Sequence, residues 1–229
     1  TRLLHRSSRS KKPVPVVAFV GYTNAGKSTL FNRLTGANVL ADDMLFATLD
    51  PTMRRIELPS GRQIVLSDTV GFVSNLPTHL IAAFRATLEE VIEADIIVHI
   101  RDVSHQDTEL QKYDVEQVLN YLGVQDTIEN PNTIEVLNKV DQLELEEYQW
   151  YKNNISENEV LLSAINGKGC SIFYDKIDQL LGNTETLYNF QIKLNNGAAI
   201  AWLHENGIIK EKSYDKSYCF IGALLSLKN

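Results

Sequence analysis

The chain has few cysteines and no long apolar run, and each absence excludes a class of protein. Its 229 residues contain two cysteines, Cys170 and Cys219, which lack the close spacing of a zinc site or a disulfide framework. We therefore expect a reducing, cytoplasmic location. No apolar run approaches the ~20 residues of a bilayer span, and the start has no apolar signal core, so we expect no stable insertion into a membrane.

An excess of positive charge is also missing. The formal net charge is −7 and the pI is about 5.3, which argues against a protein that coats nucleic acid by bulk electrostatics. A basic cluster does occupy residues 1–12: Arg2, His5, Arg6, Arg9, Lys11 and Lys12. It fits either a local contact with phosphates or, as charge runs more often do, a solvated linker. Because the chain enters on this cluster at Thr1, we expect residues 1–12 to be the end of a linker from a missing N-terminal region.

What the chain does contain is a regular alternation of strand and helix patterns. The continuous apolar run Val16–Val20 is typical of a buried strand in a parallel sheet. Helical periodicity follows from Ser28 to Leu34, with Gly36 as its stop. Residues 37–52 have little periodicity and indicate a long functional loop. A turn at Pro59-Ser60-Gly61 then predicts a hairpin between residues 53–58 and 62–67.

The later patterns complete an α/β fold with a mostly parallel sheet covered on both faces. Helices are expected at 80–93, 108–122, 145–154 and 170–181, and strands at 96–100, 133–137 and 160–162. A boundary near Gly182-Asn183-Thr184 separates this domain, 13–182, from a small second one, 187–229. The second domain has a β-α-β-β pattern of the α+β class: a strand at 187–194, a helix at 198–206 that ends at Gly207, and strands at 208–212 and 218–227.

A phosphate-binding loop follows the first strand and opens the first helix. The sequence there matches the Walker A pattern: Gly21, Tyr22, Thr23, Asn24, Ala25, Gly26, Lys27 and Ser28. Its glycines let backbone N–H groups surround a phosphate, and the helix directs its positive end at the same anion. Lys27 is predicted to neutralise charge on the β- and γ-phosphates, and the Ser28 hydroxyl to bind Mg²⁺.

Two further motifs follow strand ends. After the hairpin come Asp68, Thr69, Val70 and Gly71, where Asp68 is predicted to hold Mg²⁺ through water and Gly71 to offer its N–H to the γ-phosphate. After the strand at 133–137 come Asn138, Lys139, Val140 and Asp141. The Asp141 carboxylate can accept from the ring N–H and amine of guanine, whereas adenine presents the opposite pattern. We expect Asn138 to reach the other base edge and the Lys139 stem to lie over the ring.

A third strand end and one loop complete the predicted site. Ser163, Ala164 and Ile165 follow the strand at 160–162, and the Ala164 N–H is expected to bind the guanine carbonyl. The long loop contains Phe46, Ala47, Thr48, Leu49 and Asp50. GTPases keep in this place a threonine that closes on Mg²⁺ and the γ-phosphate. Thr48 and Thr52 both qualify, against a turn-forming or capping role for each.

With these motifs the chain resembles the GTPase domain of the HflX family, in the Obg/HflX group of translation-associated GTPases. The segments that carry the resemblance are GYTNAGKSTLFNRLTGA at 21–37, DDMLFATLDPTMRRIELPSG at 42–61, DTVGFVSNLPTHLIAAFRATLEE at 68–90 and NKVD at 138–141. The resemblance favours Thr48 as the switch threonine and as a Mg²⁺ ligand with Ser28 and Asp68. It assigns catalysis to Lys27, Thr48 and Gly71. It also implies GTP-dependent binding to the large ribosomal subunit and its RNA, and splitting or rescue of stalled ribosomes.

Phe72 occupies the place where Ras-like enzymes carry the glutamine that positions the attacking water. An apolar side chain cannot do this, so hydrolysis is expected to be slow or to use another group. The chain resembles GTPases with a hydrophobic residue here, some of which use a P-loop asparagine to hold K⁺. Asn24 fits that role or, equally, that of a loop-stabilising amide. A GTP- or GDP-binding module with little hydrolysis, and a GTPase of ribosome assembly, remain as alternatives.

Other polar and aromatic residues have ordinary interpretations. His79, His99 and His105 are expected on the switch surface, at a strand end and in a loop before a helix. Trp202 is predicted to join Ile200 and Leu203 in the core of the small domain, in preference to a base-stacking surface. We take a monomer as the default oligomeric state.

Overall fold

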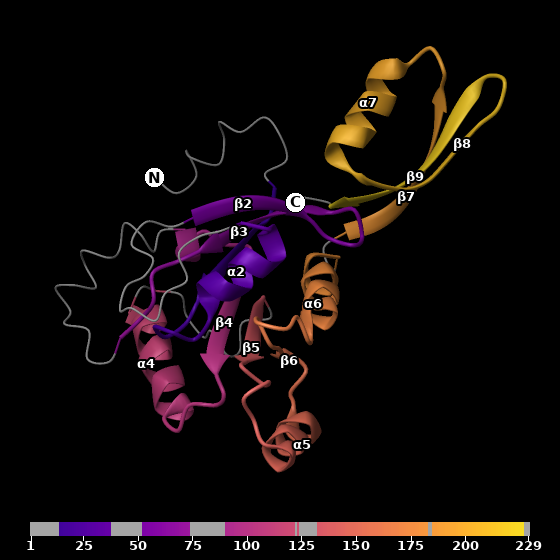
Figure 1. Cartoon of the computed structure of the whole chain (residues 1–229). Helices are drawn as coiled ribbons and strands as arrows, with labels where there is room; N and C mark the ends of the chain where they lie inside the picture. Colours follow the sequence, from indigo (N-terminus) through magenta and orange to yellow (C-terminus); the bar gives the residue numbers. More distant parts are fainter. Residues whose placement is uncertain are drawn as a thin grey trace. The chain divides into compact units, whose positions relative to one another are not determined.

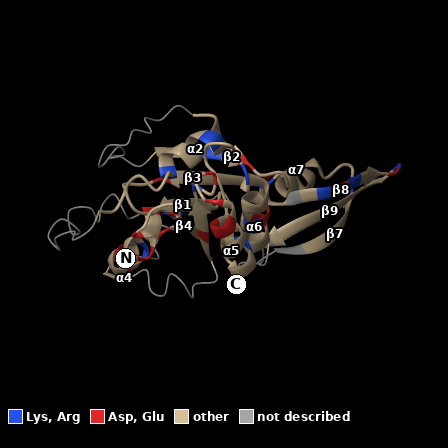
Figure 2. Cartoon of the chain, turned by 60° about the horizontal axis from the view of Figure 1, so that its bottom comes forward, with Lys and Arg blue, Asp and Glu red and all other residues tan. Residues whose placement is uncertain are grey.

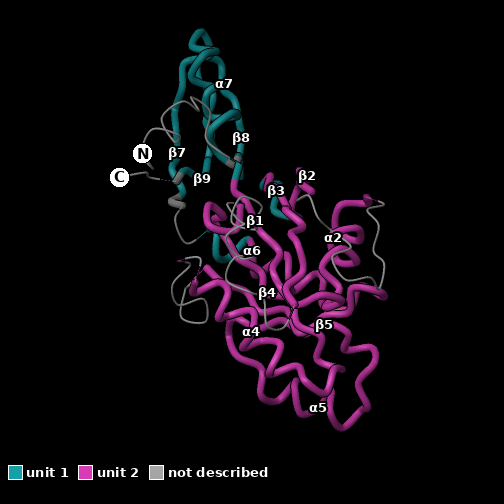
Figure 3. The backbone as a smooth tube through the Cα atoms, turned by 90° about the vertical axis from the view of Figure 1, so that its left-hand side faces the viewer, with its two compact units in different colours: residues 1–14, 59–62, 178–229 teal, residues 15–58, 63–177 magenta. Residues whose placement is uncertain are grey.

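The computed structural model describes residues 14–37, 52–73, 90–121, 123, 132–182 and 185–226. The basic cluster, most of the predicted switch loop with Thr48, and most of the helix expected at 80–93 lie outside the described residues. The chain divides into two compact units (Figure 3): one holds residues 15–58 and 63–177, and the other holds residues 1–14, 59–62 and 178–229.

The larger unit is built on a six-stranded sheet in the order β2-β3-β1-β4-β5-β6. Its strands are β1 (Val16–Val20), β2 (Thr52–Glu57), β3 (Gln63–Asp68), β4 (Ile96–Asp102), β5 (Thr133–Asn138) and β6 (Glu159–Leu161). β2 runs antiparallel to β3, and all the other pairs are parallel. This confirms the predicted α/β fold with one early hairpin and a mostly parallel sheet.

The helices alternate with these strands along the chain (Figure 1): α2 (Lys27–Thr35), α4 (Thr108–Tyr121), α5 (Leu145–Asn154) and α6 (Cys170–Gly182). α2 ends at Gly36, whose φ of 67° is the left-handed conformation that favours glycine at this position. None of the described helices is both long and apolar enough to cross a bilayer.

Both faces of β1 are buried, which explains its continuous apolar run. Ala18 and Val20 pack in a cluster with Val115, Val118 and Leu119 of α4. Phe19 points to the opposite face, where its ring meets that of Phe173 of α6 at 6.3 Å between centroids. Successive side chains of a strand point to opposite faces, so β1 is sandwiched between helices. The packing on both faces of β1 therefore fixes the point at which the next loop begins.

The small unit contains β7 (Glu185–Lys193), α7 (Gly197–Asn206), β8 (Ile208–Tyr214) and β9 (Tyr218–Ser226). Its antiparallel sheet has the order β7-β9-β8, so the predicted β-α-β-β pattern is confirmed. Leu203 of α7 packs on Cys219, Ile221 and Ala223 of β9. The Asn196 side chain caps α7 by accepting from the Ala199 N–H at 3.2 Å.

The prediction for Trp202 was wrong. Its side chain is 54% exposed, whereas Leu203 is buried and Ile200 packs against the same core. Positions three residues apart share one helix face, so Ile200 and Leu203 take the core side and Trp202 points away from it.

Figure 2 shows basic residues on β8 in this unit, and acidic residues on α5 in the larger one.

Candidate functional site

Parallel strands deliver the polar motifs to one edge of the sheet, where their carboxyl ends meet. β1 leads into residues 21–28, β3 into 68–71, β5 into 138–141, and β6 into 163–165. Residues from four distant parts of the sequence therefore lie at the same edge. Of the predicted site residues, Phe46, Ala47, Thr48, Leu49 and Asp50 lie outside the described residues.

Two glycines of the loop after β1 are required by close contacts. Gly21 has a φ of 152°, and a Cβ there would lie 2.2 Å from the Ile100 carbonyl oxygen. Gly26 has a φ of 94°, and its Cβ would lie 2.3 Å from the Asn138 side-chain nitrogen. Asn24 adopts a φ of 61° on an exposed turn, a conformation that asparagine tolerates better than most residues. The loop can therefore wind tightly enough to place its N–H groups around an anion.

Lys27 begins α2, and its side chain folds back over the loop. Its Nζ donates to the carbonyl oxygens of Gly21 at 3.1 Å and Tyr22 at 2.9 Å. An ammonium group has three donors, so these two bonds orient the charge without using all of them. Burial lowers the pKa of Lys27 to about 8, against an ordinary value of 10.5, while Asp68 opposes this shift. A fixed, buried cation of this kind is suited to bind phosphate.

Ser28 and Asp68 bring together two oxygen donors of the kind that Mg²⁺ prefers. The Ser28 hydroxyl donates to Asp68 Oδ2 at 2.7 Å. Within the described ranges, no group of three or more His, Cys, Asp or Glu residues is arranged to hold a metal. The chemistry of this hydroxyl and carboxylate pair nevertheless fits a Mg²⁺ ion that takes its other ligands from phosphates and water.

The segment after β3 is fastened to the loop after β1 by backbone hydrogen bonds. The Thr23 N–H donates to the Phe72 carbonyl at 2.7 Å, and the Phe72 N–H donates to the Gly21 carbonyl at 3.1 Å. Between these bonds, a Cβ added to Gly71 would lie 3.0 Å from Lys27 Nζ and 2.9 Å from Thr23 Cγ2. A side chain here would require Thr23 and Lys27 to shift, and the close approach places the Gly71 backbone beside the lysine charge.

The Phe72 side chain points away from this edge and into the protein. It is 3% exposed and packs with Ala18, Val20, Ile97 and residues of α4. The sequence showed that position 72 is apolar but not where its ring would lie. A residue buried in this core cannot orient a water molecule at the phosphate loop.

Asn138 joins the phosphate loop to the loop after β6. Its Nδ2 donates to the Ala25 carbonyl at 2.8 Å, and its Oδ1 accepts from the Ala164 N–H at 2.9 Å. The residue is 1% exposed. Sequence reasoning gave Asn138 a contact with the base and missed this internal role. It also left the Ala164 N–H for guanine, whereas here that group donates to Asn138.

Asp102 is a second residue that sequence reasoning missed. It ends β4 opposite Asn138 in the strand register, and its Oδ2 lies 2.7 Å from Lys139 Nζ. Oδ1 accepts from the N–H of Ser104 at 3.0 Å and from its hydroxyl at 2.5 Å. Lys139 has a φ of 64°, so Asp102 fixes a side chain on an uncommon backbone conformation. The signal that could have identified Asp102 in the sequence was a carboxylate at the end of a buried strand.

Asp141, the residue predicted to bind the guanine edge, has an exposed side chain.

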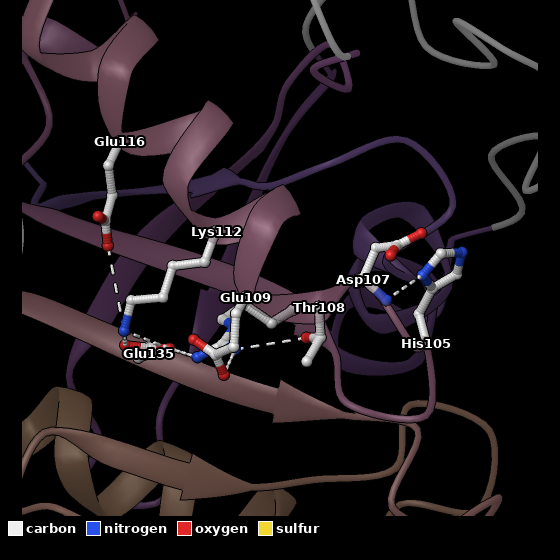
Figure 4. Close-up of polar contacts among 8 residues, drawn as sticks. His105, Asp107, Thr108, Glu109, Lys112, Glu116 and Glu135 are labelled. Carbon is white, nitrogen blue, oxygen red and sulfur yellow. Dashed lines mark hydrogen bonds and ion pairs between the residues drawn. The ribbon is translucent and has the colours of Figure 1, made fainter.

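A charged cluster fixes α4 to the strands that carry these residues (Figure 4). Lys112 donates to both carboxylate oxygens of Glu135, at 3.0 and 2.8 Å, and lies 4.0 Å from Glu116. Arg101 pairs with Glu135 and, at 2.5 Å, with Glu109. Burial tends to raise the pKa of Glu135, but the attraction of Arg101 and then Lys112 outweighs it and lowers the pKa. The cluster therefore fastens α4 to β4 and β5, the strands that end in Asp102 and Asn138.

His99 and His105 have structural surroundings. His99 is buried within β4, and burial lowers its pKa to about 4, so it is neutral at pH 7. His105 accepts from the Asp107 N–H at 3.1 Å in the loop before α4 (Figure 4). His79 lies outside the described residues.

Comparison with known proteins finds related GTPases. The family model described as "50S ribosome-binding GTPase" matches residues 16–139. "GTPase HflX" of Lacrimispora saccharolytica is 40% identical over 218 residues, which cover 95% of this chain and 50% of the relative. "GTPase HflX" of Magnetococcus marinus is 43% identical over 217 residues, covering 92% and 48%. The chain thus spans about half the length of the curated relatives it matches.

A solved structure shares the fold. It is a GTP-binding protein from the archaeon Sulfolobus solfataricus in complex with GDP, with 26% identity and a TM-score of 0.54. The match covers 80% of this chain and 57% of that chain.

Proposed function

This chain belongs to the HflX family of GTPases, and we propose that it binds guanine nucleotides and hydrolyses GTP to GDP and phosphate. One observation carries the proposal most directly: Asn138 physically joins the loop that would hold the phosphates to the loop that would face the base. A single nucleotide spans these two places in the P-loop fold, so the two halves of the site are built as one.

On the phosphate side, Lys27 and the loop N–H groups bind the β- and γ-phosphates. Ser28 and Asp68, together with Thr48 of the switch loop, would hold Mg²⁺, which would supply positive charge to offset the negative charge of the phosphates. The Gly71 N–H, placed beside Lys27, binds the γ-phosphate. Water attacks the γ-phosphorus while the bond to the β-phosphate oxygen breaks, which releases GDP and inorganic phosphate.

On the base side, Asp141 accepts from the ring N–H and amine of guanine, and Lys139 lays its stem across the ring. The ion pair with Asp102 at 2.7 Å supports this placement of Lys139. In the loop of Ser163, Ala164 and Ile165, the Ser163 N–H donates to the Lys168 carbonyl and the Ala164 N–H donates to Asn138, so we assign the contact with the guanine carbonyl to the Ile165 N–H. Because adenine reverses the donor and acceptor pattern of this edge, the site discriminates against ATP.

Slow intrinsic hydrolysis follows from the position of Phe72. Its burial in the core leaves the attacking water without a side chain from this position, so another group, a bound K⁺ near Asn24 or a partner, supplies the missing stabilisation. The same observation favours a second candidate function, a GTP- or GDP-binding module with little hydrolysis of its own.

The biological setting we propose is the large ribosomal subunit and its RNA, with ribosome splitting or rescue as the outcome. The match to the model of a 50S ribosome-binding GTPase over residues 16–139 supports this partner. A role in ribosome assembly is the alternative within the same setting. The net charge of −7 means that binding to RNA depends on local contacts and not on bulk electrostatics.

Single-turnover hydrolysis of GTP, measured with and without purified large subunits and in K⁺ or Na⁺, tests the proposal. We expect slow hydrolysis alone and faster hydrolysis with subunits. No hydrolysis under any of these conditions would favour the nucleotide-binding module. Sedimentation with mature subunits or assembly precursors, in the presence of a non-hydrolysable GTP analogue, separates the two ribosomal roles.

A further inference from the structure

Arg33 reaches from the helix after the phosphate loop to the loop after β6. It lies in the last turn of α2. Its Nε donates to the Ala164 carbonyl at 2.5 Å, and its Nη2 donates to the Ile165 carbonyl. These two carbonyls are consecutive along the backbone, and the planar fork of a guanidinium group is suited to bind such a pair.

The loop is shaped to receive this side chain. Gly167 has a φ of 87°, and a Cβ there would lie 3.0 Å from Arg33 Nη1. The loop closes on itself through hydrogen bonds from the Gly167 N–H to the Ser163 carbonyl at 2.8 Å and from the Ser163 N–H to the Lys168 carbonyl at 2.9 Å. Within this frame, the carbonyls of Ala164 and Ile165 turn outward to the arginine.

Holding these carbonyls also fixes the direction of the peptide N–H groups. In a trans peptide the C=O and N–H bonds point in opposite directions, so binding of the Ala164 carbonyl by Arg33 sets the direction of the Ile165 N–H. Asn138 holds the Ala164 N–H from the interior. The segment that faces the base is therefore held from two sides, by Asn138 and by Arg33.

We propose that Arg33 is a positioning residue for guanine selection: by binding the Ala164 and Ile165 carbonyls, it aims the Ile165 N–H at the carbonyl oxygen of guanine. The inference rests on the proposed function, because it assigns a role within the same nucleotide site. Arg33 does not touch the base and acts through the loop backbone.

A purely structural tether would weaken all nucleotides equally, whereas a positioning role is specific to the base carbonyl. The experiment compares GDP with 6-thioguanosine 5′-diphosphate, which keeps the edge read by Asp141 and replaces the carbonyl oxygen by sulfur, a weaker acceptor. Affinities of both are measured by calorimetry on the full 229-residue chain and on Arg33→Ala and Arg33→Lys. Arg55→Ala, an exposed arginine of β2, is the matched control.

We expect the wild-type chain and Arg55→Ala to prefer GDP by about tenfold, and Arg33→Ala to lose most of that preference, with Arg33→Lys between them. Equal weakening of both nucleotides in Arg33→Ala, no weakening, or no wild-type preference for GDP would each overturn the inference while leaving the proposed function intact. Urea unfolding without nucleotide identifies any variant that fails to fold, and Arg33→Lys then carries the comparison. Failure of the wild-type chain to bind either nucleotide would refute the proposed function and this inference together.

Discussion

Replacing Asn138 by aspartate is expected to destabilise the chain even when no nucleotide is present. The substitution keeps the size of the side chain and leaves an oxygen to accept from the Ala164 N–H. It removes the Nδ2 donor, which now binds the Ala25 carbonyl at 2.8 Å. A carboxylate oxygen would face that carbonyl instead, at a position that is 1% exposed, so water cannot compensate.

The size of the effect follows from these contacts. Leaving a buried acceptor without its donor costs about 1–3 kcal/mol, and burying a carboxylate beside a carbonyl adds to it. We expect the free energy of unfolding to fall by about 2–4 kcal/mol, a large share of the roughly 5–15 kcal/mol of a typical domain. GDP affinity should also fall by at least about tenfold, because the two loops would no longer be held together.

Urea unfolding of nucleotide-free protein measures the first effect, and calorimetry with GDP the second. Asn154→Asp is the matched control: the Asn154 amide donates to the Trp150 carbonyl at 2.7 Å, but on an exposed helix surface, so a change below about 0.5 kcal/mol is expected. If Asn138→Asp lowered GDP affinity without changing the unfolding free energy, Asn138 would act on the base alone, and the argument for an internal tether would fail.

Three further changes test other parts of the site. Asp102→Asn should weaken GDP binding by about five- to tenfold in calorimetry, because Lys139 loses its charged partner at 2.7 Å; unchanged affinity would contradict that role. Phe72→Gln should not speed single-turnover GTP hydrolysis and should cost about 2–4 kcal/mol of unfolding free energy, since the side chain is 3% exposed; faster hydrolysis would show that residue 72 reaches the phosphates. Burial lowers the pKa of His99 to about 4 from 6.5, so the folded state favours the neutral imidazole. The contribution of neutral His99 to the free energy of unfolding is therefore complete above pH 6.5 and is lost as the pH falls to 4. Between these two pKa values the free energy of unfolding of the wild-type chain should rise by about 1.4 kcal/mol per pH unit. Urea unfolding of His99→Gln at several pH values should lack this rise.

The sequence predicted most of the fold because its signals are local. The apolar run Val16–Val20 and the hairpin turn at residues 59–61 each determine structure within a few residues, and the observed strands begin and end within about two residues of the expected positions. The phosphate-loop motif can also be recognised locally, because it needs only a strand before it and a helix after it. Ser28 and Asp68, 40 residues apart in sequence, then meet because parallel strands end at one edge.

The residues that sequence reasoning missed act through contacts between distant segments. Asp102 and Lys139 become partners because β4 and β5 are neighbours in register, and Arg33 meets a loop more than 130 residues away in sequence. No local pattern names such a partner. The wrong prediction for Trp202 has a similar cause. The large apolar ring of Trp202 suggested a core residue, but Leu203 determines which face of α7 packs on the sheet.

We propose that this chain holds a guanine-nucleotide site in which Asp141 selects the base. Calorimetric titration of GDP, GTP and ATP into the chain and into Asp141→Asn tests it most directly. We expect binding of GDP and GTP in about the micromolar range, no comparable binding of ATP, and a loss of guanine affinity in the variant. Equal binding of ATP and GTP, or no binding of either, would contradict it.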